Sequence, residues 1–322
     1  MDTIAKITAF TAALAASFGA AYGVGLIAGP QAGAIGSPAH PRGSESGAPR
    51  PGGGVTDASA AGLGITEGGY TLVLRTSRMT ADRSGTLRFA VHDRSGHPVT
   101  GFRREHGKEL HLILASRNLT TYRHLHPVRA ADGTWSTPVE LPEAGDYRVF
   151  ADFTPAGKNT RNLTLGADLA VSGPYEAAGM PEPAPSVTVD GYTVFLKGAL
   201  RPGLPERLAF SVRKDGRPVT GLQPYLGAYG HLVALRAGDL AYLHAHPEGG
   251  PDAHSAEPGP DVSFTTTAPS PATYRLFLDF KHGGTVRTAA FTVPSEAAQD
   301  VSRQTVPQDS PSEVHGDDGH GH

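Results

Sequence analysis

A chain of 322 residues has room for about two domains of ordinary size. Lysine and arginine number 28 against 31 aspartates and glutamates, so the chain lacks the basic excess typical of nucleic-acid binding, and we expect no nucleic-acid partner. The sequence contains no cysteine, which excludes disulfides, thiolate zinc sites, iron–sulfur clusters and blue-copper centres. Its 15 histidines remain as candidate metal ligands.

Residues 1–28 predict a transmembrane helix that serves as a signal anchor. Ile7–Ala28 is an uncharged stretch of 22 residues, close to the roughly 20 that a helix needs to cross a bilayer. A cleaved signal peptide is the alternative, although this stretch exceeds the usual apolar region of such peptides. We therefore expect a single-pass protein of the cell membrane with an extracytoplasmic body, or a secreted protein if the segment is cleaved.

Two segments have compositions that cannot bury enough apolar surface to offset the ordering of the chain. Residues 29–65 consist largely of glycine, proline, serine and alanine and predict a flexible linker. Residues 295–322 are polar and end in HGDDGHGH, which predicts a disordered tail rich in histidine and aspartate.

An internal repeat occupies the region between the linker and the tail. Gly96–Pro127 aligns without a gap on Gly216–Pro247 at a constant offset of 120 residues. DYRVFADF and GYTLVL recur as TYRLFLDF and GYTVFL, so the repeat extends over a whole domain. The predicted copies are residues 66–172 and 187–294, joined by a proline-rich linker over 173–186.

Short runs of β-branched and aromatic residues alternate with turn residues inside each copy, the pattern of an all-β sandwich or barrel. We therefore predict an all-β protein of two tandem antiparallel β-sandwich repeats, immunoglobulin-like or cupredoxin-like, after the N-terminal transmembrane helix. The strands expected in the first copy are 69–75, 86–92, 109–116, 120–126, 133–140, 146–153 and 163–171.

Three histidines occur at the same spacing in both copies: His111, His124 and His126, and His231, His244 and His246. His124 and His126 are two residues apart, so in a strand they project from one face. A short polar turn near Arg117-Asn118 predicts a hairpin in which His111 lies opposite His124, about 5 Å away. We therefore expect one three-histidine patch in each repeat.

Neutral imidazole is a good ligand for zinc and copper, so each patch predicts a site for a copper or zinc ion. The candidates for a fourth ligand are His106 in the first copy and His254 in the second. Asp152 and Asp279 occupy equivalent positions and could act as ligands or as acceptors behind the ligands. The tail histidines could bind metal weakly or deliver it.

A structural role is the alternative for the repeated histidines, which could hydrogen-bond across strands or to Tyr122 or Tyr242. The protein would then be a tandem β-sandwich that binds a partner. We predict no enzymatic activity, because no repeated glutamate lies beside the histidines as a general base and no nucleophile elbow, phosphate loop or catalytic triad is recognisable.

The phrases KELHLILASRNLTTYRHLHP, GDYRVFADFTPAG and TYRLFLDFKHGG, with the second-copy sequence GHLVALRAGDLAYLHAHP, resemble a family of actinobacterial exported or membrane-anchored proteins labelled heavy-metal-binding. The likeness covers most of residues 66–294. It implies metal binding by the six repeated histidines and no catalytic residue. The expected function is metal buffering, resistance or delivery, the last with a metal-transport partner protein.

Overall fold

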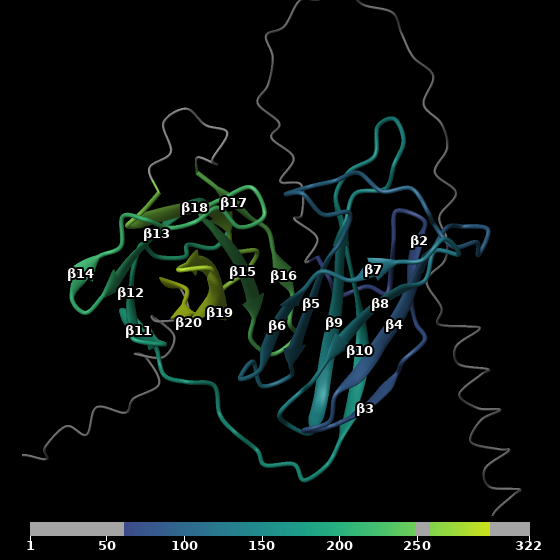
Figure 1. Ribbon diagram of the computed structural model, residues 1–322, viewed down its shortest axis with the longest axis horizontal. Helices are drawn as coiled ribbons and strands as arrows, with labels where there is room; N and C mark the ends of the chain where they lie inside the picture. Colours follow the sequence, from purple (N-terminus) through teal and green to yellow (C-terminus); the bar gives the residue numbers. More distant parts are fainter. Residues whose placement is uncertain (1–60, 249–257, 297–322) are drawn as a thin grey trace, which may run out of the picture. The chain divides into compact units, whose positions relative to one another are not determined.

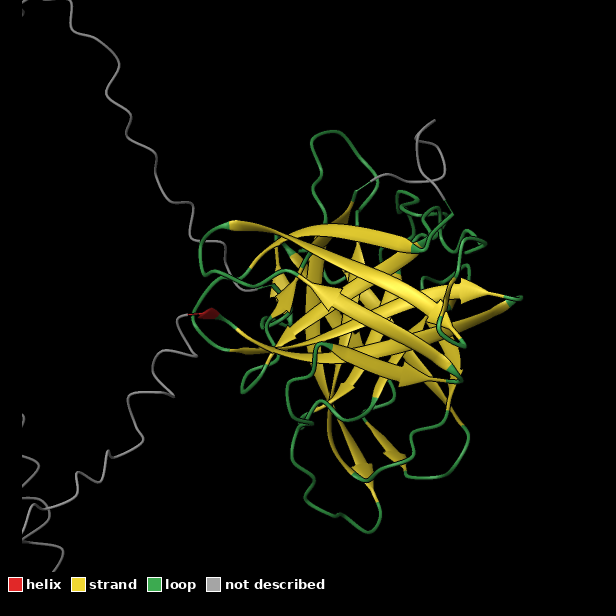
Figure 2. Cartoon of the chain, turned by 90° about the vertical axis from the view of Figure 1, so that its left-hand side faces the viewer, coloured by secondary structure: helices red, strands yellow, loops and turns green. Residues whose placement is uncertain are grey.

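Alternating apolar runs and glycine-rich turns give an all-β fold in the computed structural model, which describes residues 61–248 and 258–296. Strands account for every described element except a helical turn that begins at Glu296 (Figure 2). No described helix is long and apolar enough to cross a membrane, and the anchor predicted at Ile7–Ala28 lies outside the described residues. The prediction of an all-β fold is thus confirmed for the described part of the chain.

The first repeat is a sandwich of two five-stranded sheets (Figure 1). The first sheet has the spatial order β1 (Thr66–Glu67), β2 (Tyr70–Leu74), β4 (Gly85–His92), β8 (Trp135–Val139) and β7 (Val128–Arg129). The second sheet has the order β3 (Arg78–Thr80), β10 (Leu163–Ser172), β9 (Gly145–Phe153), β5 (His111–Ser116) and β6 (Tyr122–Leu125). Within the two sheets β3 runs parallel to β10, and the other neighbouring strands are antiparallel.

The second repeat is also a sandwich of two sheets, one of six strands and one of four. One sheet has the order β11 (Ser186–Val189), β12 (Tyr192–Lys197), β13 (Pro205–Lys214), β18 (Asp261–Thr267) and β17 (Ala245–Pro247), with β14 (Arg217–Pro218) also paired to β13. The other has the order β16 (Tyr242–Leu243), β15 (Gly230–Arg236), β19 (Thr273–His282) and β20 (Thr285–Pro294). β15 therefore corresponds to β5, and β19 to β9.

All seven strands predicted for the first copy are present, each within about two residues of its expected ends. The sequence missed β1, β3 and β7, which have only two or three residues each. A strand of that length is too short to show the alternation of apolar and polar residues by which strands are recognised.

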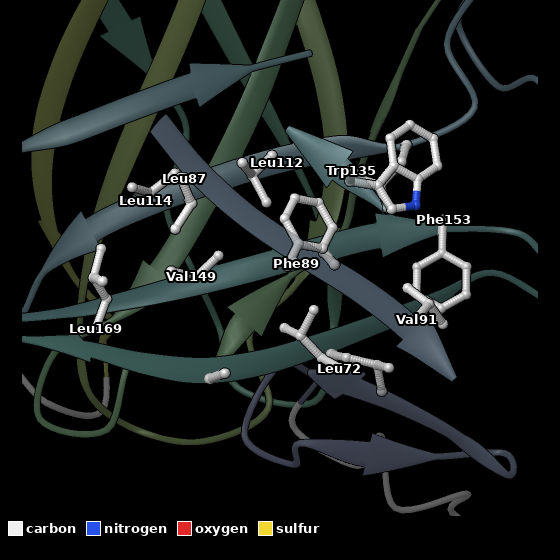
Figure 3. Close-up of a cluster of buried hydrophobic side chains, with 14 of the residues drawn as sticks. Leu72, Leu87, Phe89, Val91, Leu112, Leu114, Trp135, Val149, Phe153 and Leu169 are labelled. Carbon is white, nitrogen blue, oxygen red and sulfur yellow. The ribbon is translucent and has the colours of Figure 1, made fainter. Parts of the chain in front are cut away.

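β5 is buried along its whole length because both of its faces pack against protein. Leu112 and Leu114 point into the core of their own sandwich, opposite Leu87 and Phe89 of β4 (Figure 3). Ile113, between them, points the other way into a second apolar cluster. Two-sided burial explains why HLILAS reads as a continuous apolar run instead of an alternating one.

The second apolar cluster joins the two repeats, which belong to one compact unit. Tyr122 stacks on Phe277 of the second repeat, with ring centroids 4.1 Å apart. Tyr242, the equivalent of Tyr122, contacts Phe150 of the first repeat at 5.7 Å. Each repeat therefore offers the same aromatic pair to the other, so the contact is reciprocal in the manner of a twofold interface.

The segment that precedes β1 contacts both repeats. The amide of Gly62 donates a hydrogen bond to the carbonyl of Thr164, and the amide of Tyr242 donates to the carbonyl of Ala61. The guanidinium of Arg148 donates to the carbonyl of Gly62. A Cβ on Gly166 would lie 1.9 Å from that carbonyl oxygen, so this close approach requires glycine.

We predict that the Tyr122–Phe277 stack is a main source of the stability of the contact between repeats. Tyr122→Ala should lower the free energy of unfolding by about 3–5 kcal/mol, since a large buried aromatic ring is lost. The Tyr122 hydroxyl is buried and has no hydrogen-bond partner in the part of the chain that the structure describes, so Tyr122→Phe should leave stability unchanged or slightly raised. Urea unfolding monitored by circular dichroism checks both, and equal stability of the two variants would contradict the prediction.

Candidate metal centre

The two His-x-His pairs lie where the chain passes from one sheet of each sandwich to the other, and His111 and His231 stand at the beginnings of β5 and β15. β6 pairs with β5, and two residues after it β7 pairs with β8 in the opposite sheet. β16 and β17 make the same transfer in the second repeat, from β15 to β18. The His-x-His-Pro sequence therefore sits at the edge of each sandwich, beside the contact between repeats.

The β5–β6 hairpin is present, but its predicted register is wrong by two residues. His124 pairs with Ile113, and His111 pairs with Asp152 of β9. The turn is longer than expected because Leu119 adopts a left-handed backbone conformation and is buried in the cluster between the repeats. Since side chains alternate with a period of two, this shift leaves His111 and His124 on the same face.

His111, His124 and His126 converge. One nitrogen from each can be chosen so that all three lie within 4.8 Å of one another. The ring centroids of these histidines are 4.9–5.3 Å apart. Nitrogens bonded to one zinc or copper ion at about 2.0–2.1 Å lie within about 4 Å of each other, so small side-chain rotations would suffice for shared ligation.

The hydrogen bonds of His111 and His124 fix where their protons lie. His111 Nε2 is 3.2 Å from the carbonyl oxygen of Glu105, and a carbonyl only accepts, so Nε2 carries the proton. His124 Nδ1 donates in the same way to Asp279 Oδ2 at 2.8 Å. The remaining nitrogens, His111 Nδ1 and His124 Nε2, face each other at 3.1 Å. In the neutral rings, both present lone pairs to the same point.

Asp279 reaches this site from the second repeat. It is only 2% exposed, and its other carboxylate oxygen accepts a hydrogen bond from the hydroxyl of Thr288 at 2.6 Å. A carboxylate behind a histidine ligand is the usual arrangement at metal sites, where it sets the tautomer and orientation of the ring. The sequence left two roles open for Asp279, a metal ligand or an acceptor behind a histidine. In the structure it is the acceptor behind His124.

His126 has the least satisfied ring of the three. Its Nε2 is buried and has no hydrogen-bond partner among the described residues. A buried polar atom without a partner is costly, unless an ion or a water molecule engages it. Among the described residues, this nitrogen is therefore the one ring nitrogen of the triad that is both buried and without a partner.

Burial keeps His111, His126 and His231 neutral. Burial, followed by the charge of His124, lowers the pKa of His111 to about 4 and that of His126 to about 3. The same two causes lower the pKa of His231 to about 3. These three rings are therefore uncharged at neutral pH, the form in which imidazole binds a metal ion.

The second set of histidines does not assemble in the same way. The described residues contain one converging group of three, and it does not include His231, His244 or His246. His231 instead lies beside the first triad, with its ring centroid 6.1 Å from His111 and 6.0 Å from His124. The expected second patch is thus divided between two places.

His244 is turned toward the first repeat. Its Nε2 is 3.1 Å from the hydroxyl of Thr164 and 3.7 Å from Asp152 Oδ1. Burial alone would lower its pKa, but the hydrogen bond and charge of Asp152 outweigh burial, so the pKa of His244 is raised. Asn162 donates a hydrogen bond to the same Asp152 oxygen at 2.7 Å. Asp279 has no equivalent donor, because the residue that corresponds to Asn162 in the second repeat is Val286.

A cavity of about 320 Å³ joins the two groups of histidines. Its lining includes side chains of both repeats: Glu105, His106, His111, His124, Asp152, Asn162, His231, Tyr242, His244 and His246. His106 is exposed, with its ring centroid 5.1 Å from His231 and 6.1 Å from His111. His254 and the histidines of the tail lie outside the described residues.

Several groups that contact the histidines or their acceptors were not identified from the sequence. The carbonyl of Glu105, the hydroxyls of Thr164 and Thr288 and the ring of Tyr225 all contact a histidine or its acceptor. Thr164 and Thr288 have a recognisable signal, since each stands opposite the repeated aspartate of its own sheet. Backbone carbonyls have no such signal, because any residue supplies one.

None of the curated proteins matches this chain. Among solved structures, the chain is similar to FdeC, an adhesin of Escherichia coli, at 15% identity and a TM-score of 0.22, over 71% of this chain and 65% of that one. InvD of Yersinia pseudotuberculosis matches at 14% identity and a TM-score of 0.22, over 70% and 57%. A marsupial T cell receptor matches at 13% identity and a TM-score of 0.21, over 70% and 96%. The chain thus spans less than two thirds of the two bacterial chains.

One family model matches the chain twice, over residues 65–167 and 187–297. Its description is a domain of unknown function, DUF8832. The two matches confirm the internal repeat and together cover more than half of the sequence. The chain therefore belongs to the DUF8832 family and contains its domain in two copies.

Proposed function

We propose that this protein binds a transition-metal ion, copper or zinc, through His111, His124 and His126. The observation that carries the proposal is the 3.1 Å approach of His111 Nδ1 and His124 Nε2, whose partner nitrogens both donate to oxygen acceptors. Two lone pairs directed at each other repel unless a proton or a cation lies between them. The buried, unpartnered Nε2 of His126 supports a cation.

The role that follows is binding and holding of a metal ion in buffering, resistance or delivery. The resemblance of the repeats to proteins labelled heavy-metal-binding supports this role. We assign no catalytic step to the site. A metal-transport protein is the kind of partner with which delivery would take place.

A structural role is the second candidate, and the contacts between repeats favour it. His124 joins Asp279, and His244 joins Thr164, so both histidines connect the two sandwiches without any metal. If His124 carries two protons, its Nε2 donates to His111 Nδ1 and the short contact becomes an ordinary hydrogen bond. The two candidates therefore differ in what lies between His111 Nδ1 and His124 Nε2. It is a metal ion in the first candidate and a proton in the second.

Metal titration separates the two candidates. The purified chain without residues 1–28 should take up one Zn²⁺ or Cu²⁺ ion per molecule at the triad in calorimetry. Replacing His111, His124 and His126 together by alanine should abolish this uptake, whereas His97→Ala, a change at an exposed histidine outside the site, should not affect it. Absence of uptake by the unaltered chain, or uptake that survives the triple change, would refute the proposal.

The pKa values of the buried histidines predict the acid sensitivity of the metal-free protein. His111, His126 and His231 have folded pKa values of about 4, 3 and 3, below the roughly 6.5 of an unfolded chain. The stability that their neutral forms contribute is complete above pH 6.5 and is lost as the pH falls toward 4, because the unfolded chain binds protons first. His244 acts in the opposite direction and in another range: its folded pKa is raised, so the stability that it contributes is complete below about pH 6.5 and is lost as the pH rises above that value.

Thermal unfolding at a series of pH values, in the presence of a chelator, measures this effect. The midpoint should fall between pH 6.5 and 4, and the fall should be smaller in His126→Gln, which removes one of the three groups. A midpoint that does not change over this range would contradict neutral burial of His111, His126 and His231.

We also propose that Ile7–Ala28 anchors the protein so that both repeats face the extracytoplasmic side. The basis is the length and the lack of charge of that segment. In fractionated cells the full chain should sediment with membranes and be digested by protease added outside. A chain found in the soluble cytoplasmic fraction would contradict this part of the proposal.

A further inference from the structure

We infer that the metal site is shared between the repeats: His231 of the second repeat supplies a fourth imidazole to the ion held by His111, His124 and His126. This inference rests on the proposed metal binding and adds a consequence to it. The bound ion would link the two sandwiches, and the chain would hold one ion in place of one per repeat.

The hydrogen bonds of His231 engage its Nε2 and leave Nδ1 with a lone pair, as a metal ligand requires. His231 Nε2 is 3.0 Å from the carbonyl oxygen of Tyr225 and 3.2 Å from that of Leu226. Both oxygens only accept, so Nε2 carries the proton and Nδ1 has the lone pair. His111 has the same arrangement with Glu105, which stands at the position equivalent to Tyr225. The fold thus orients both histidines by the same contact.

The position of His231 also fits. Its ring centroid is 6.0 Å from that of His124 and 6.1 Å from that of His111. These separations are less than 1 Å longer than the largest one within the triad, which is 5.3 Å. A small rotation of the side chain closes such a difference. Structural zinc sites in proteins are almost always four-coordinate, so three histidines leave one position for it.

The surroundings of this fourth position exclude the other candidates. Tyr225 places its ring 6.0 Å from His126 and 5.8 Å from His231, and so lies against both of them. His106 is exposed on a loop, and Leu226 stands at its place in the second copy. His244 has its Nε2 at Thr164 and Asp152. Of the remaining cavity histidines, His246 is exposed.

The test compares the unaltered chain without residues 1–28 with His231→Gln. Glutamine can still donate from its amide to the carbonyl of Tyr225, but it has no nitrogen in place of Nδ1. Loss of a group behind a ligand already costs about 10–100-fold in affinity, so loss of a ligand should weaken Zn²⁺ binding at least about tenfold. The control is His97→Gln, the same substitution at an exposed histidine outside the site, which should leave Zn²⁺ affinity unchanged.

Two spectroscopic measurements count the ligands directly. Co²⁺ in place of Zn²⁺ should show the intense visible bands of a tetrahedral site in the unaltered chain and weaker bands in His231→Gln. Pulsed EPR of the Cu²⁺-loaded unaltered chain should detect four coordinated imidazoles. This second measurement needs no variant and therefore holds even if His231→Gln does not fold.

The outcomes distinguish this inference from the proposed function. If the unaltered chain binds no metal, the proposed function fails. If it binds metal with three imidazoles, or if His231→Gln binds Zn²⁺ as tightly as the unaltered chain, the triad stands and the role of His231 is overturned. A loss of affinity in His106→Ala that equals the loss expected for His231→Gln would likewise overturn it, in favour of His106.

Discussion

The packing of β5 and β9 against β15 and β19 is the interaction on which the candidate site depends. Ile113 and Phe150 from one repeat meet Val233 and Phe277 from the other in a single buried cluster. Each of these strands therefore has two apolar faces, one toward its own core and one toward the other repeat. Because His111 and His231 stand at the beginnings of β5 and β15, and His124 lies on β6 beside β5, the apolar contact also brings polar groups of both repeats together.

Polar groups buried at such a contact must find partners there. Asp279 is almost completely buried, and an unpaired charge in that position would cost several kcal/mol. Its two oxygens accept from His124 and Thr288, which satisfies the carboxylate and at the same time fixes the tautomer of His124. The contact between repeats thus engages one nitrogen of His124 and leaves the other directed at His111.

Much of the fold could be predicted from the sequence, because each of the longer sandwich strands carries a local signal. Short β-branched and aromatic runs separated by turn residues located the seven main strands of the first copy. The constant offset between the copies revealed the repeat. The convergence of His111 with His124 also survived a wrong register, since an error of two residues preserves the face of a strand. The length of the turn was lost because Leu119 is held inside by the other repeat, which no local pattern records.

The part of the site that comes from the second repeat could not be predicted. Asp279 and His231 were recognised as members of their own copy, but the sequence contains no signal for which faces of two domains meet. The division of the second histidine set has the same origin. His244 turns to Thr164 and Asp152 because those residues face it across the contact, not because of its neighbours in sequence.

The reciprocal aromatic pairs have a consequence for how the two copies can differ. Two separate, identical domains that met through this surface would form a symmetric dimer, and every group at the contact would occur twice. Joined in one chain, each half can change independently. Glu105 and His106 correspond to Tyr225 and Leu226, and Asn162 corresponds to Val286. Duplication followed by divergence can in this way convert two equal sites into one site with unequal halves, a form that two identical subunits related by exact symmetry cannot have.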